Sequence, residues 1–412
     1  MLYTEITQTE NKTVTNLKNK VLAQPNIKIE QHIYNGINKE LAEFKIRLNL
    51  LKIVLRHFKS PIKIINILLK LDKIRRKVLG QNRLRKLVKA NGKLYWDLYT
   101  PGCESYAFDR YIEGEINRIT PIKSTTNRFI NVFLAITKKC SLKCEHCYEW
   151  ESLNLKETLS YSDLKSIVEK VQEKGVGQIQ FTGGEPLLRI DDLIRLIETA
   201  SVETEFWINT SGHKLTLENA RRLKDAGLNG VVISLDHFDK DLHNSFRGNK
   251  YSFDWVQNGV QNSIANNLVV GLSICVTRSF VSKKNLLSYA QMAKAMKVSF
   301  IQILEPKPVG HYKNKDVLLN NEQLKLLEEF YIELNYNKRF KDYPIITYHG
   351  FHQRKLGCFA AGNRSFYIDT DGDIHACPFC QKKSGNVLDM DFDTSIESLL
   401  KFGCHSFEEA KI

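Results

Sequence analysis

The chain has 412 residues, of which 42% are hydrophobic and 26% charged, so it can form two or three domains and bury a core. Its basic surplus is local, because residues 41–90 hold 15 Lys and Arg against two acidic residues, a net charge of +13, while the remainder is nearly neutral. This distribution excludes a uniformly basic nucleic-acid-binding protein, and no uncharged apolar run approaches the roughly 18 residues of a membrane-spanning helix.

Residues 1–40 are polar and show no sustained periodicity, so we expect a flexible N-terminus. This segment does not have the pattern of a secretory signal, which predicts a cytoplasmic protein whose thiols stay reduced. Residues 41–120 form a basic, largely helical region. Within that region, the turn Asn91-Gly92 predicts a hairpin-like stretch.

Strand-like and helical sequence patterns alternate over residues 125–310. Helical patterns separate six β-rich runs, and two of these patterns end at Gly175 and Gly227, as helix C-termini commonly do. The alternation predicts parallel strands with right-handed crossovers, and six units are too few for a closed eight-stranded barrel. We therefore predict an α/β fold, as a partial (β/α)6 TIM-like barrel or a doubly wound sheet, with ligands at the carboxyl ends of the strands. The six runs are 129–137, 178–182, 205–210, 230–236, 269–277 and 298–304.

Two further segments complete the predicted organisation. Residues 311–350 form a linking segment with a charged helix at about 321–336. Residues 351–412 are turn-rich and contain four of the nine cysteines. So small a unit lacks the apolar mass for its own core and usually needs a metal or disulfide staple, so we predict a small cysteine-rich C-terminal domain.

Three cysteines follow the first predicted strand in the sequence CSLKCEHCY. An odd number of cysteines, unevenly clustered in a reducing compartment, favours metal ligation over disulfides. Thiolates at Cys140, Cys144 and Cys147 can ligate three corners of an iron–sulfur cube, which leaves one iron open to a small molecule. A zinc site with His146 as the fourth ligand is the alternative.

Glycine and polar residues lie at the ends of the next predicted strands. Gly183 and Gly184 allow the backbone to approach a ligand closely, and Glu185 offers an acceptor for an ammonium group. Arg247 carries a guanidinium suited to bidentate carboxylate binding, with a surface position at a helix as the alternative. Hydroxyl and amide groups at the third and fourth strand ends, which offer either ligand contacts or strand capping, are those of Asn209, Thr210 and Ser234.

The CxxxCxxC spacing followed by Tyr148, together with the GGEP sequence at 183–186, resembles the radical S-adenosylmethionine (radical SAM) enzymes over about 129–304. The resemblance implies that the open iron of a 4Fe–4S cluster binds S-adenosylmethionine (SAM). One electron then cleaves SAM to methionine and a 5′-deoxyadenosyl radical, which abstracts a hydrogen atom from a substrate. Flavodoxin or ferredoxin is the expected electron donor. The residues implied to contact SAM are Tyr148, Gly183, Gly184, Glu185, Asn209, Thr210, Ser234 and Arg247.

The family also implies a role for each of these residues. The Gly-Gly-Glu segment would receive the SAM amino group, and Asn209 or Thr210, with Ser234, would contact the ribose or the carboxylate. The segment around Arg247 is similar to the SLDG…H…RG segment of SPASM-type members, which makes Arg247 a partner for the SAM carboxylate. Here His237 stands where the family often has Gly, so the local turn can differ.

The tail carries four cysteines, which are Cys358, Cys377, Cys380 and Cys404. Asp371-Gly372 predicts a hairpin turn that brings Cys377 toward Cys358. Four thiolates can ligate one 4Fe–4S cluster or form a closed zinc site. The CxxAG…I..DG.I..C run resembles the SPASM/twitch extensions of radical SAM enzymes, and four cysteines rather than about seven imply a single auxiliary 4Fe–4S cluster for electron transfer or substrate anchoring.

A basic amphipathic helix is predicted over 61–79, between Ser60-Pro61 and Gly80. Such a helix fits a membrane surface or an acidic partner, and the alternative is a helix packed on the barrel with solvated lysines. Its apolar face holds Ile64, Leu68, Leu71 and Val78, and its basic face holds Lys63, Lys70, Lys73 and Lys77.

The sequence leaves two hypotheses for the substrate of an enzyme and a third hypothesis in which the protein is not an enzyme. Tail-bearing relatives often modify ribosomally made peptides or side chains of other proteins, so the resemblance implies a peptide or protein substrate, with the N-terminal region holding a leader peptide. The basic helix supports the alternative of a lipid or isoprenoid substrate at the inner face of the membrane. A non-catalytic zinc or iron–sulfur adaptor is the third hypothesis, and no nucleic acid partner is expected.

Overall fold

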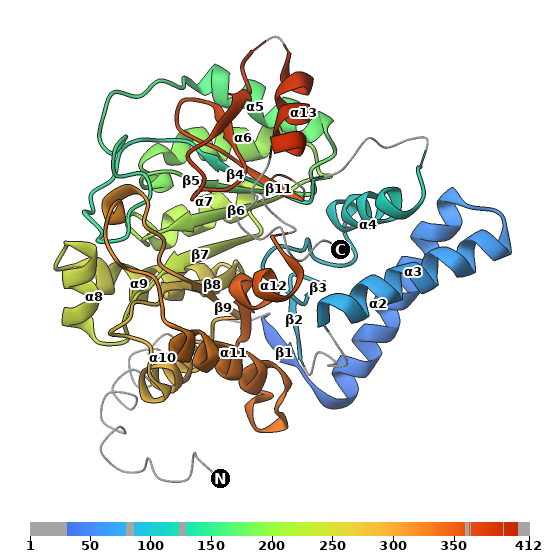
Figure 1. Cartoon of the computed structure of the whole chain (residues 1–412), viewed down its shortest axis with the longest axis horizontal. Helices are drawn as coiled ribbons and strands as arrows, with labels where there is room; N and C mark the ends of the chain where they lie inside the picture. The colour runs from blue at the N-terminus through green and yellow to red at the C-terminus, as the bar shows by residue number, and fades with distance from the viewer. Residues whose placement is uncertain are drawn as a thin grey trace.

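The computed structural model describes residues 31–79, 86–122, 129–358, 362, 364–389 and 391–402. Figure 1 shows a large group of strands and helices, with α2 and α3 set to one side next to α4. The segment 1–40, which we expect to be flexible, lies mostly outside the described residues, as does Cys404.

A ten-stranded sheet forms the centre of the molecule, in the order β10-β9-β8-β7-β6-β5-β4-β11-β12-β13. All neighbours from β10 to β11 pair in parallel, whereas β12 and β13 pair antiparallel. The predicted α/β fold with a parallel sheet is therefore confirmed, and β4 to β9 correspond to the six expected runs. The strands are β4 (Asn131–Ala135), β5 (Gln178–Thr182), β6 (Glu205–Thr210), β7 (Gly230–Ser234), β8 (Val269–Cys275), β9 (Phe300–Leu304), β10 (Ile345–Tyr348), β11 (Ser365–Ile368), β12 (Asp373–His375) and β13 (Lys383–Asn386).

Two parallel strands lie outside the range expected for the barrel, and they extend it at opposite ends. β10 pairs with β9 and comes from the predicted linking segment, while β11 pairs with β4 and comes from the predicted C-terminal domain. The sheet thus continues across the boundaries that we expect near residues 310 and 351.

Helices connect the strands and cover one face of the sheet. Ser160 and Asp163 form a capping box that starts α5, and Gly227, with φ of +111°, ends α7. On that face Ile179 and Phe181 of β5 pack into the main core. The helices are α5 (Tyr161–Glu173), α6 (Ile190–Thr199), α7 (Leu217–Ala226), α8 (Lys240–Arg247), α9 (Ser252–Ala265), α10 (Lys283–Ala295), α11 (Asn321–Tyr336), α12 (His349–Leu356) and α13 (Phe392–Phe402), with short 3-10 turns η1 (Pro186–Arg189), η2 (Gly310–Tyr312) and η3 (Lys338–Phe340).

The residues before the barrel form a small module around a sheet in the order β1-β2-β3. Asn91 and Gly92, with φ of 51° and 77°, join the antiparallel strands β2 and β3, so the predicted hairpin is confirmed. Ile53, Phe108 and Ile116 lie in a core shared by the helices of this module. Its elements are β1 (His32–Tyr34), α2 (Gly36–His57), α3 (Pro61–Leu79), β2 (Leu87–Ala90), β3 (Lys93–Tyr95) and α4 (Tyr106–Ile119).

The predicted basic helix is present as α3. Its apolar face reaches the module core through the buried Ile64, and Lys63, Lys70 and Lys73 are exposed. The side chains of residues 77–79 lie outside the described part of the structure. No helix among the described residues has both the length and the apolar character to cross a membrane.

The N-terminal module packs on the face of the sheet opposite the helices, at the amino end of the strands. We call this face the inner face. Val269 and Phe300, the first residues of β8 and β9, pack in one cluster with Tyr95 and Leu98 of the module. Gln178, the first residue of β5, donates from Nε2 to the Leu98 carbonyl at 3.2 Å. Because the amino end is filled, the carboxyl end of this face is the end left for a ligand.

Candidate functional site

The three-cysteine loop follows β4 at the carboxyl edge of the sheet. Cys144 is buried, while Cys140 and Cys147 are half-buried. The Cys147 N–H donates to the Cys144 carbonyl at 3.3 Å, which closes a tight turn. Asn154, in the left-handed region at φ 63°, accepts from the Cys140 N–H at 3.0 Å and donates to the Cys140 carbonyl at 3.1 Å. The loop is therefore fixed at both ends.

Two other segments hold the outside of this loop. Backbone carbonyls at the end of α8 accept two hydrogen bonds from it, each at 3.1 Å. His311 of η2 donates its N–H to the Cys147 carbonyl at 2.9 Å, and its Nδ1 lies 2.9 Å from the Cys144 carbonyl. A Cβ on Gly310 would lie 2.2 Å from the Cys147 carbonyl oxygen, so glycine is required at that position.

Gly183 and Gly184 pack directly on the backbone of this loop. The Gly184 N–H donates to the Thr137 carbonyl and the Glu185 N–H to the Lys139 carbonyl, both at 2.7 Å. A Cβ on Gly184 would lie 2.3 Å from the Lys139 oxygen, and Gly183 has a φ of +123°. The close approach that we expect toward a ligand is thus made toward the cysteine-bearing backbone.

Glu185 is buried and accepts four hydrogen bonds from the protein itself. Oε1 accepts from the Leu187 N–H at 3.2 Å and from the Thr210 hydroxyl at 2.7 Å. Oε2 accepts from the Ser211 N–H at 2.9 Å and from the Ser211 hydroxyl at 2.5 Å. Burial raises the pKa of Glu185, and the Ser211 and Thr210 hydrogen bonds oppose that rise. The carboxylate therefore ties the end of β5 to the end of β6.

A buried ion pair lies against the central cysteine. Arg247 donates from Nε to Asp236 Oδ2 at 2.5 Å and from Nη1 to Cys144 Sγ at 3.4 Å. Burial raises the pKa of Asp236, but the opposite effect of Arg247 and the neighbouring histidines is larger. The pKa of Asp236 therefore lies below its ordinary value. Arg247 is therefore a fixed positive charge beside a predicted cluster ligand.

Two histidines surround this ion pair. His243 Nδ1 accepts from the Asp236 N–H at 3.1 Å, and His146 Nε2 lies 3.9 Å from Asp236 Oδ1. Burial lowers the pKa of each histidine to about 4, so both rings are neutral at pH 7. Within the described part of the chain, His146 Nδ1 and His243 Nε2 are buried without a hydrogen-bond partner. His146, the alternative zinc ligand, thus directs its Nε2 toward Asp236.

The donor chemistry of the loop fits a cationic metal group. Burial raises the pKa of Cys140 and of Cys147 to about 12, and the nearby Cys144 adds to both rises. Burial also raises the pKa of Cys144, which Arg247 partly opposes. Cysteines ligate metal as thiolates, so an iron–sulfur group would supply the missing positive charge. The described residues contain no group of three His, Cys, Asp or Glu side chains arranged to hold a single metal ion.

The other residues expected to contact SAM lie in two places, beside the cysteine loop and at the ends of β6 and β7. Tyr148 places its hydroxyl 3.0 Å from Thr182 Oγ1 at the end of β5. Thr210 lies beside the loop through its bond to Glu185. Asn209 and Ser234 are partly exposed at the carboxyl ends of β6 and β7, on the face of the sheet that carries Trp207 and Val232.

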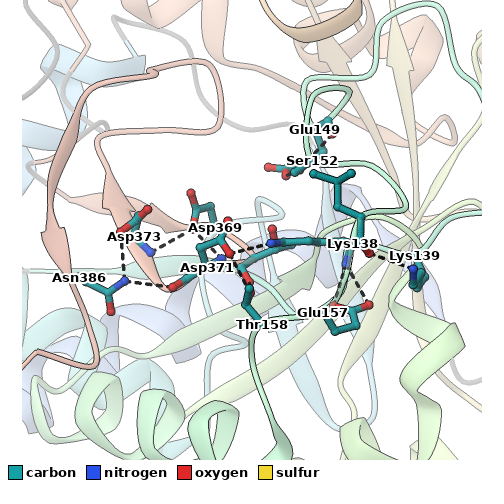
Figure 2. Close-up of polar contacts among 12 residues, drawn as sticks. Lys138, Lys139, Glu149, Ser152, Glu157, Thr158, Asp369, Asp371, Asp373 and Asn386 are labelled. Atoms are coloured by element: carbon teal, nitrogen blue, oxygen red, sulfur yellow. Dashed lines mark hydrogen bonds and ion pairs between the residues drawn. The ribbon is translucent and has the colours of Figure 1, made fainter.

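The tail lies next to the loop because β11 pairs with β4. Lys138 donates from Nζ to Asp371 Oδ1 at 2.6 Å, and the Thr158 hydroxyl donates to the same oxygen at 2.8 Å (Figure 2). Asp371 stands in the turn between β11 and β12, so the hairpin predicted from Asp371-Gly372 is confirmed. The segments on both sides of the three cysteines therefore contact this turn.

Tyr148 makes a second contact between loop and tail. Its ring meets Tyr367 and Phe379 edge-on, with centroids 6.0 Å away in each case. The Tyr367 hydroxyl also donates to Glu149, directly after Tyr148. The tail thus covers the aromatic residue that follows the third cysteine.

The tail cysteines within the described residues lie against the main core. Cys358, Cys377 and Cys380 are half-buried at the edge of the main core. The Cys380 N–H donates to the Cys377 carbonyl at 3.0 Å, and Gln353 Nε2 lies 3.4 Å from Cys358 Sγ. The fourth expected ligand, Cys404, lies outside the described residues.

Sequence reasoning missed a polar group on the inner face of the sheet. The Thr347 hydroxyl donates to Asp97 Oδ1 at 2.7 Å, Gln302 donates to the Tyr99 hydroxyl, and the Tyr99 and His349 rings lie 4.5 Å apart. Burial raises the pKa of Asp97 and lowers that of His349 to about 4, although both side chains are partly exposed. Asp97 and Tyr99 come from the N-terminal module, and the only signal for them is polar sequence directly after the predicted hairpin.

Part of this chain is similar to known proteins. Residues 134–284 match the family model described as the radical SAM superfamily. A GTP 3′,8-cyclase of Aliarcobacter butzleri (strain RM4018) is 28% identical over 203 residues, which cover 47% of this chain and 60% of the cyclase. The match thus spans less than two thirds of that relative.

Two solved structures share the fold. Native anSMEcpe with bound AdoMet aligns with a TM-score of 0.53 and 19% identity, over 66% of this chain and 82% of that one. Streptococcus suis SuiB bound to its precursor peptide SuiA aligns with a TM-score of 0.54 and 14% identity, over 81% of this chain and 76% of that one.

Proposed function

We propose that this protein is a radical SAM enzyme in which Cys140, Cys144 and Cys147 hold a 4Fe–4S cluster that binds SAM, because residues 134–284 match the family model of the radical SAM superfamily. When bound, such a cluster supplies the electron that cleaves SAM to methionine and a 5′-deoxyadenosyl radical. The observation that carries the proposal is the placement of three buried or half-buried thiols on one loop, with Arg247 3.4 Å from Cys144 Sγ.

The neighbouring residues would hold SAM against this loop. We assign the SAM amino group to the backbone of Gly183 and Gly184, because the four hydrogen bonds to Glu185 make it a positioning residue for the same turn. Asn209 and Ser234 are the proposed contacts of the ribose or the carboxylate, since both are partly exposed at strand ends. The expected contact of Arg247 with the SAM carboxylate stays part of the proposal, alongside its contact with Cys144.

A second cluster is proposed in the tail, with Cys358, Cys377, Cys380 and Cys404 as ligands. The proposal is supported by the half-buried Cys377 and Cys380, which flank Phe379, whose ring meets that of Tyr148. Its proposed role is electron transfer or substrate anchoring, with zinc as the alternative metal. Flavodoxin or ferredoxin remains the proposed electron donor.

For the substrate we propose a peptide or protein segment that enters the inner face of the sheet. Asp97, Tyr99 and His349 line that face and offer hydrogen-bonding groups of the kind that peptide amides and side chains satisfy. A lipid substrate is the second candidate, and the exposed apolar side chains of α2 and α3 favour it. The similarity to a GTP 3′,8-cyclase makes GTP a compound to be tested as well.

The test is an assay of 5′-deoxyadenosine released by the anaerobically reconstituted full chain with SAM and dithionite. It is run without addition, with GTP, and with peptides that co-purify with the protein. Release that rises with the peptides supports the proposal, and release that rises only with GTP contradicts the proposed substrate. If the protein bound zinc and released no 5′-deoxyadenosine, the result would support the hypothesis of a non-catalytic adaptor.

A further inference from the structure

We infer that α2 and α3 form a docking surface for an anionic lipid bilayer. Half of the large apolar side chains that are exposed in the described residues belong to these two helices. We call these eight side chains the hairpin face. It consists of Ile37, Leu41, Phe44, Leu48 and Leu55 of α2 and Ile62, Ile65 and Leu69 of α3. The inference does not depend on the radical chemistry proposed above.

On α2 the apolar positions form one stripe. At 100° per residue, all five fall within a sector of about 60°, because they recur at spacings of three, four and seven. Ile37, Leu41 and Phe44 are 80%, 59% and 59% exposed. The buried residues of α2, among them Ala42 and Ile46, lie on the opposite side of the helix. The stripe therefore does not contribute to the core of the module.

On α3 the pattern repeats. Ile62 and Leu69 are 74% and 63% exposed, and Ile65 lies between them on the same side. The buried Ile64 and Ile67 occupy the opposite side. Since α2 and α3 pack on each other and both pack on α4 with their buried sides, each stripe faces away from α4, and Figure 1 shows the two helices together at one side of the molecule.

Positive charges flank both stripes. By the same helical geometry, Lys45 and Lys52 lie on one side of the α2 stripe and are exposed. Arg47 lies on the other side with Glu40, and Arg47 is 3.9 Å from Glu43. On α3, Lys63 and Lys70 are exposed on one flank of the helix, about 80–100° from Ile62. In the described structure none of these four lysines forms an ion pair. Apolar side chains flanked by free lysines suit the boundary between acyl chains and anionic headgroups, where the lysine stems extend toward phosphate.

The charge pattern argues against a second copy of this chain as the partner. Two such faces brought together would gather Lys45 and Lys52 of both copies at one apolar contact, while the nearby Glu40 and Glu43 already pair with Lys39 and Arg47 of their own chain. The size argues against a single acidic helix, because residues 37–55 span about 27 Å of helix and the face continues onto α3. A bilayer surface satisfies both the charge and the breadth of the hairpin face.

Vesicle co-sedimentation of the full chain tests this inference. The vesicles contain phosphatidylcholine alone or phosphatidylcholine with 30% phosphatidylglycerol. We expect binding to the anionic vesicles that weakens as salt is raised, because exposed charges are screened. The combined variant Leu41→Ser, Phe44→Ser, Ile62→Ser and Ile65→Ser, and the combined variant Lys45→Glu, Lys52→Glu, Lys63→Glu and Lys70→Glu, should each bind at least tenfold more weakly.

Matched controls use exposed residues elsewhere on the molecule. One control carries Val202→Ser, Leu217→Ser, Leu242→Ser and Leu318→Ser, and the other carries Lys283→Glu, Lys284→Glu, Lys325→Glu and Lys338→Glu. Both controls should bind like the wild type. Failure of the wild type to bind anionic vesicles would overturn the inference, as would equal loss in the control variants. The inference would also be overturned if the wild type were a dimer that the Ser variant converts to a monomer. Binding of an acidic helical protein to the hairpin face, without binding to vesicles, would overturn it too.

Discussion

The two cysteine-containing regions of the chain are held in different ways. The loop at 140–147 receives hydrogen bonds from Asn154, from the end of α8, from η2 and from the Gly183-Gly184 turn. The tail cysteines at 358–380 are half-buried at the edge of the core, and their fourth proposed partner lies outside the described residues. The loop is therefore shaped by the barrel itself, whereas we expect the tail to gain order from its metal.

This difference has a consequence for function. A site shaped by the fold can keep one metal position open, because its geometry does not depend on a fourth protein ligand. A site shaped by its metal needs a full set of ligands. The comparison therefore predicts that loss of a loop cysteine removes the chemistry, while loss of a tail cysteine removes a cofactor.

The largest effect is expected for Cys144→Ala. The substitution removes the proposed central ligand and the partner of Arg247, so 5′-deoxyadenosine release should fall to the level without protein. Chromatography of the anaerobic reaction with SAM and dithionite measures the release. Cys103→Ala, a buried cysteine of the N-terminal module, is the matched control and should keep the activity. If the Cys144 variant released as much 5′-deoxyadenosine as the wild type, the assignment of the loop to the active site would be wrong.

A smaller loss is expected for Arg247→Gln. The guanidinium lies beside Cys144 Sγ and is the proposed partner of the SAM carboxylate, so SAM cleavage should fall by roughly 10–100-fold while iron content stays near that of the wild type. The paramagnetic resonance signal of the reduced protein should shift, which a purely structural residue would not cause.

The double variant Arg247→Gln with Asp236→Asn controls for an uncompensated buried charge. It should restore the melting temperature lost in the single variant, without restoring the cleavage rate. If the double variant also recovered full cleavage, the role of Arg247 beside the cluster would be refuted.

Cys380→Ala tests the other half of the comparison. We predict about eight irons per wild-type chain, four for each of two cubanes, and about four in this variant. SAM cleavage should persist in part, because the loop keeps its own ligands. An unchanged iron content would exclude Cys380 as a ligand, and complete loss of cleavage would contradict the separation of the two regions.

The smallest effect concerns the anchoring of the tail to the N-terminal module. Glu115 of α4 accepts from Arg364, which directly precedes β11, at 3.0 and 2.9 Å. Glu115→Gln should cost about 2 kcal/mol of unfolding free energy at pH 7, because it leaves a largely buried Arg364 uncompensated. Denaturant unfolding measures the loss, with the exposed Glu169→Gln as control.

The pH dependence of that loss follows from the pKa of Glu115. Burial raises this pKa, but Arg364 and Arg118 lower it more, so the folded value lies below the ordinary 4.5. A lowered folded pKa gives stability that is present above the unfolded value and is lost as pH falls through the folded one. The difference between wild type and variant should therefore shrink below pH 4.5, and a constant difference would contradict this account.

Local features of the molecule were predictable from the sequence. The helix ends at Ser160 and Gly227 and the turns at Asn91-Gly92 and Asp371-Gly372 depend on a few adjacent residues. The three-cysteine loop is equally local, since its ligands lie within eight residues. The six strands between 129 and 304 carry their pattern in their own composition.

Non-local features were not predictable. β10 and β11 join the sheet through parallel pairing with β9 and β4, which no nearby residue encodes. Glu185 carries a carboxylate suited to an ammonium, yet two of its four donors come from Ser211, 26 residues later. Asp97 and Thr347 meet across 250 residues. The exposed stripe of α2 becomes visible only once its opposite side is seen to be buried.

The most direct test of the central claim is paramagnetic resonance of the reduced, anaerobically reconstituted protein with and without SAM. If Cys140, Cys144 and Cys147 hold a cluster with one open iron, the spectrum will contain a 4Fe–4S signal that SAM changes, and Cys144→Ala will lose that change. A protein without such a signal, or one whose signals all stay the same when SAM is added, would contradict the account.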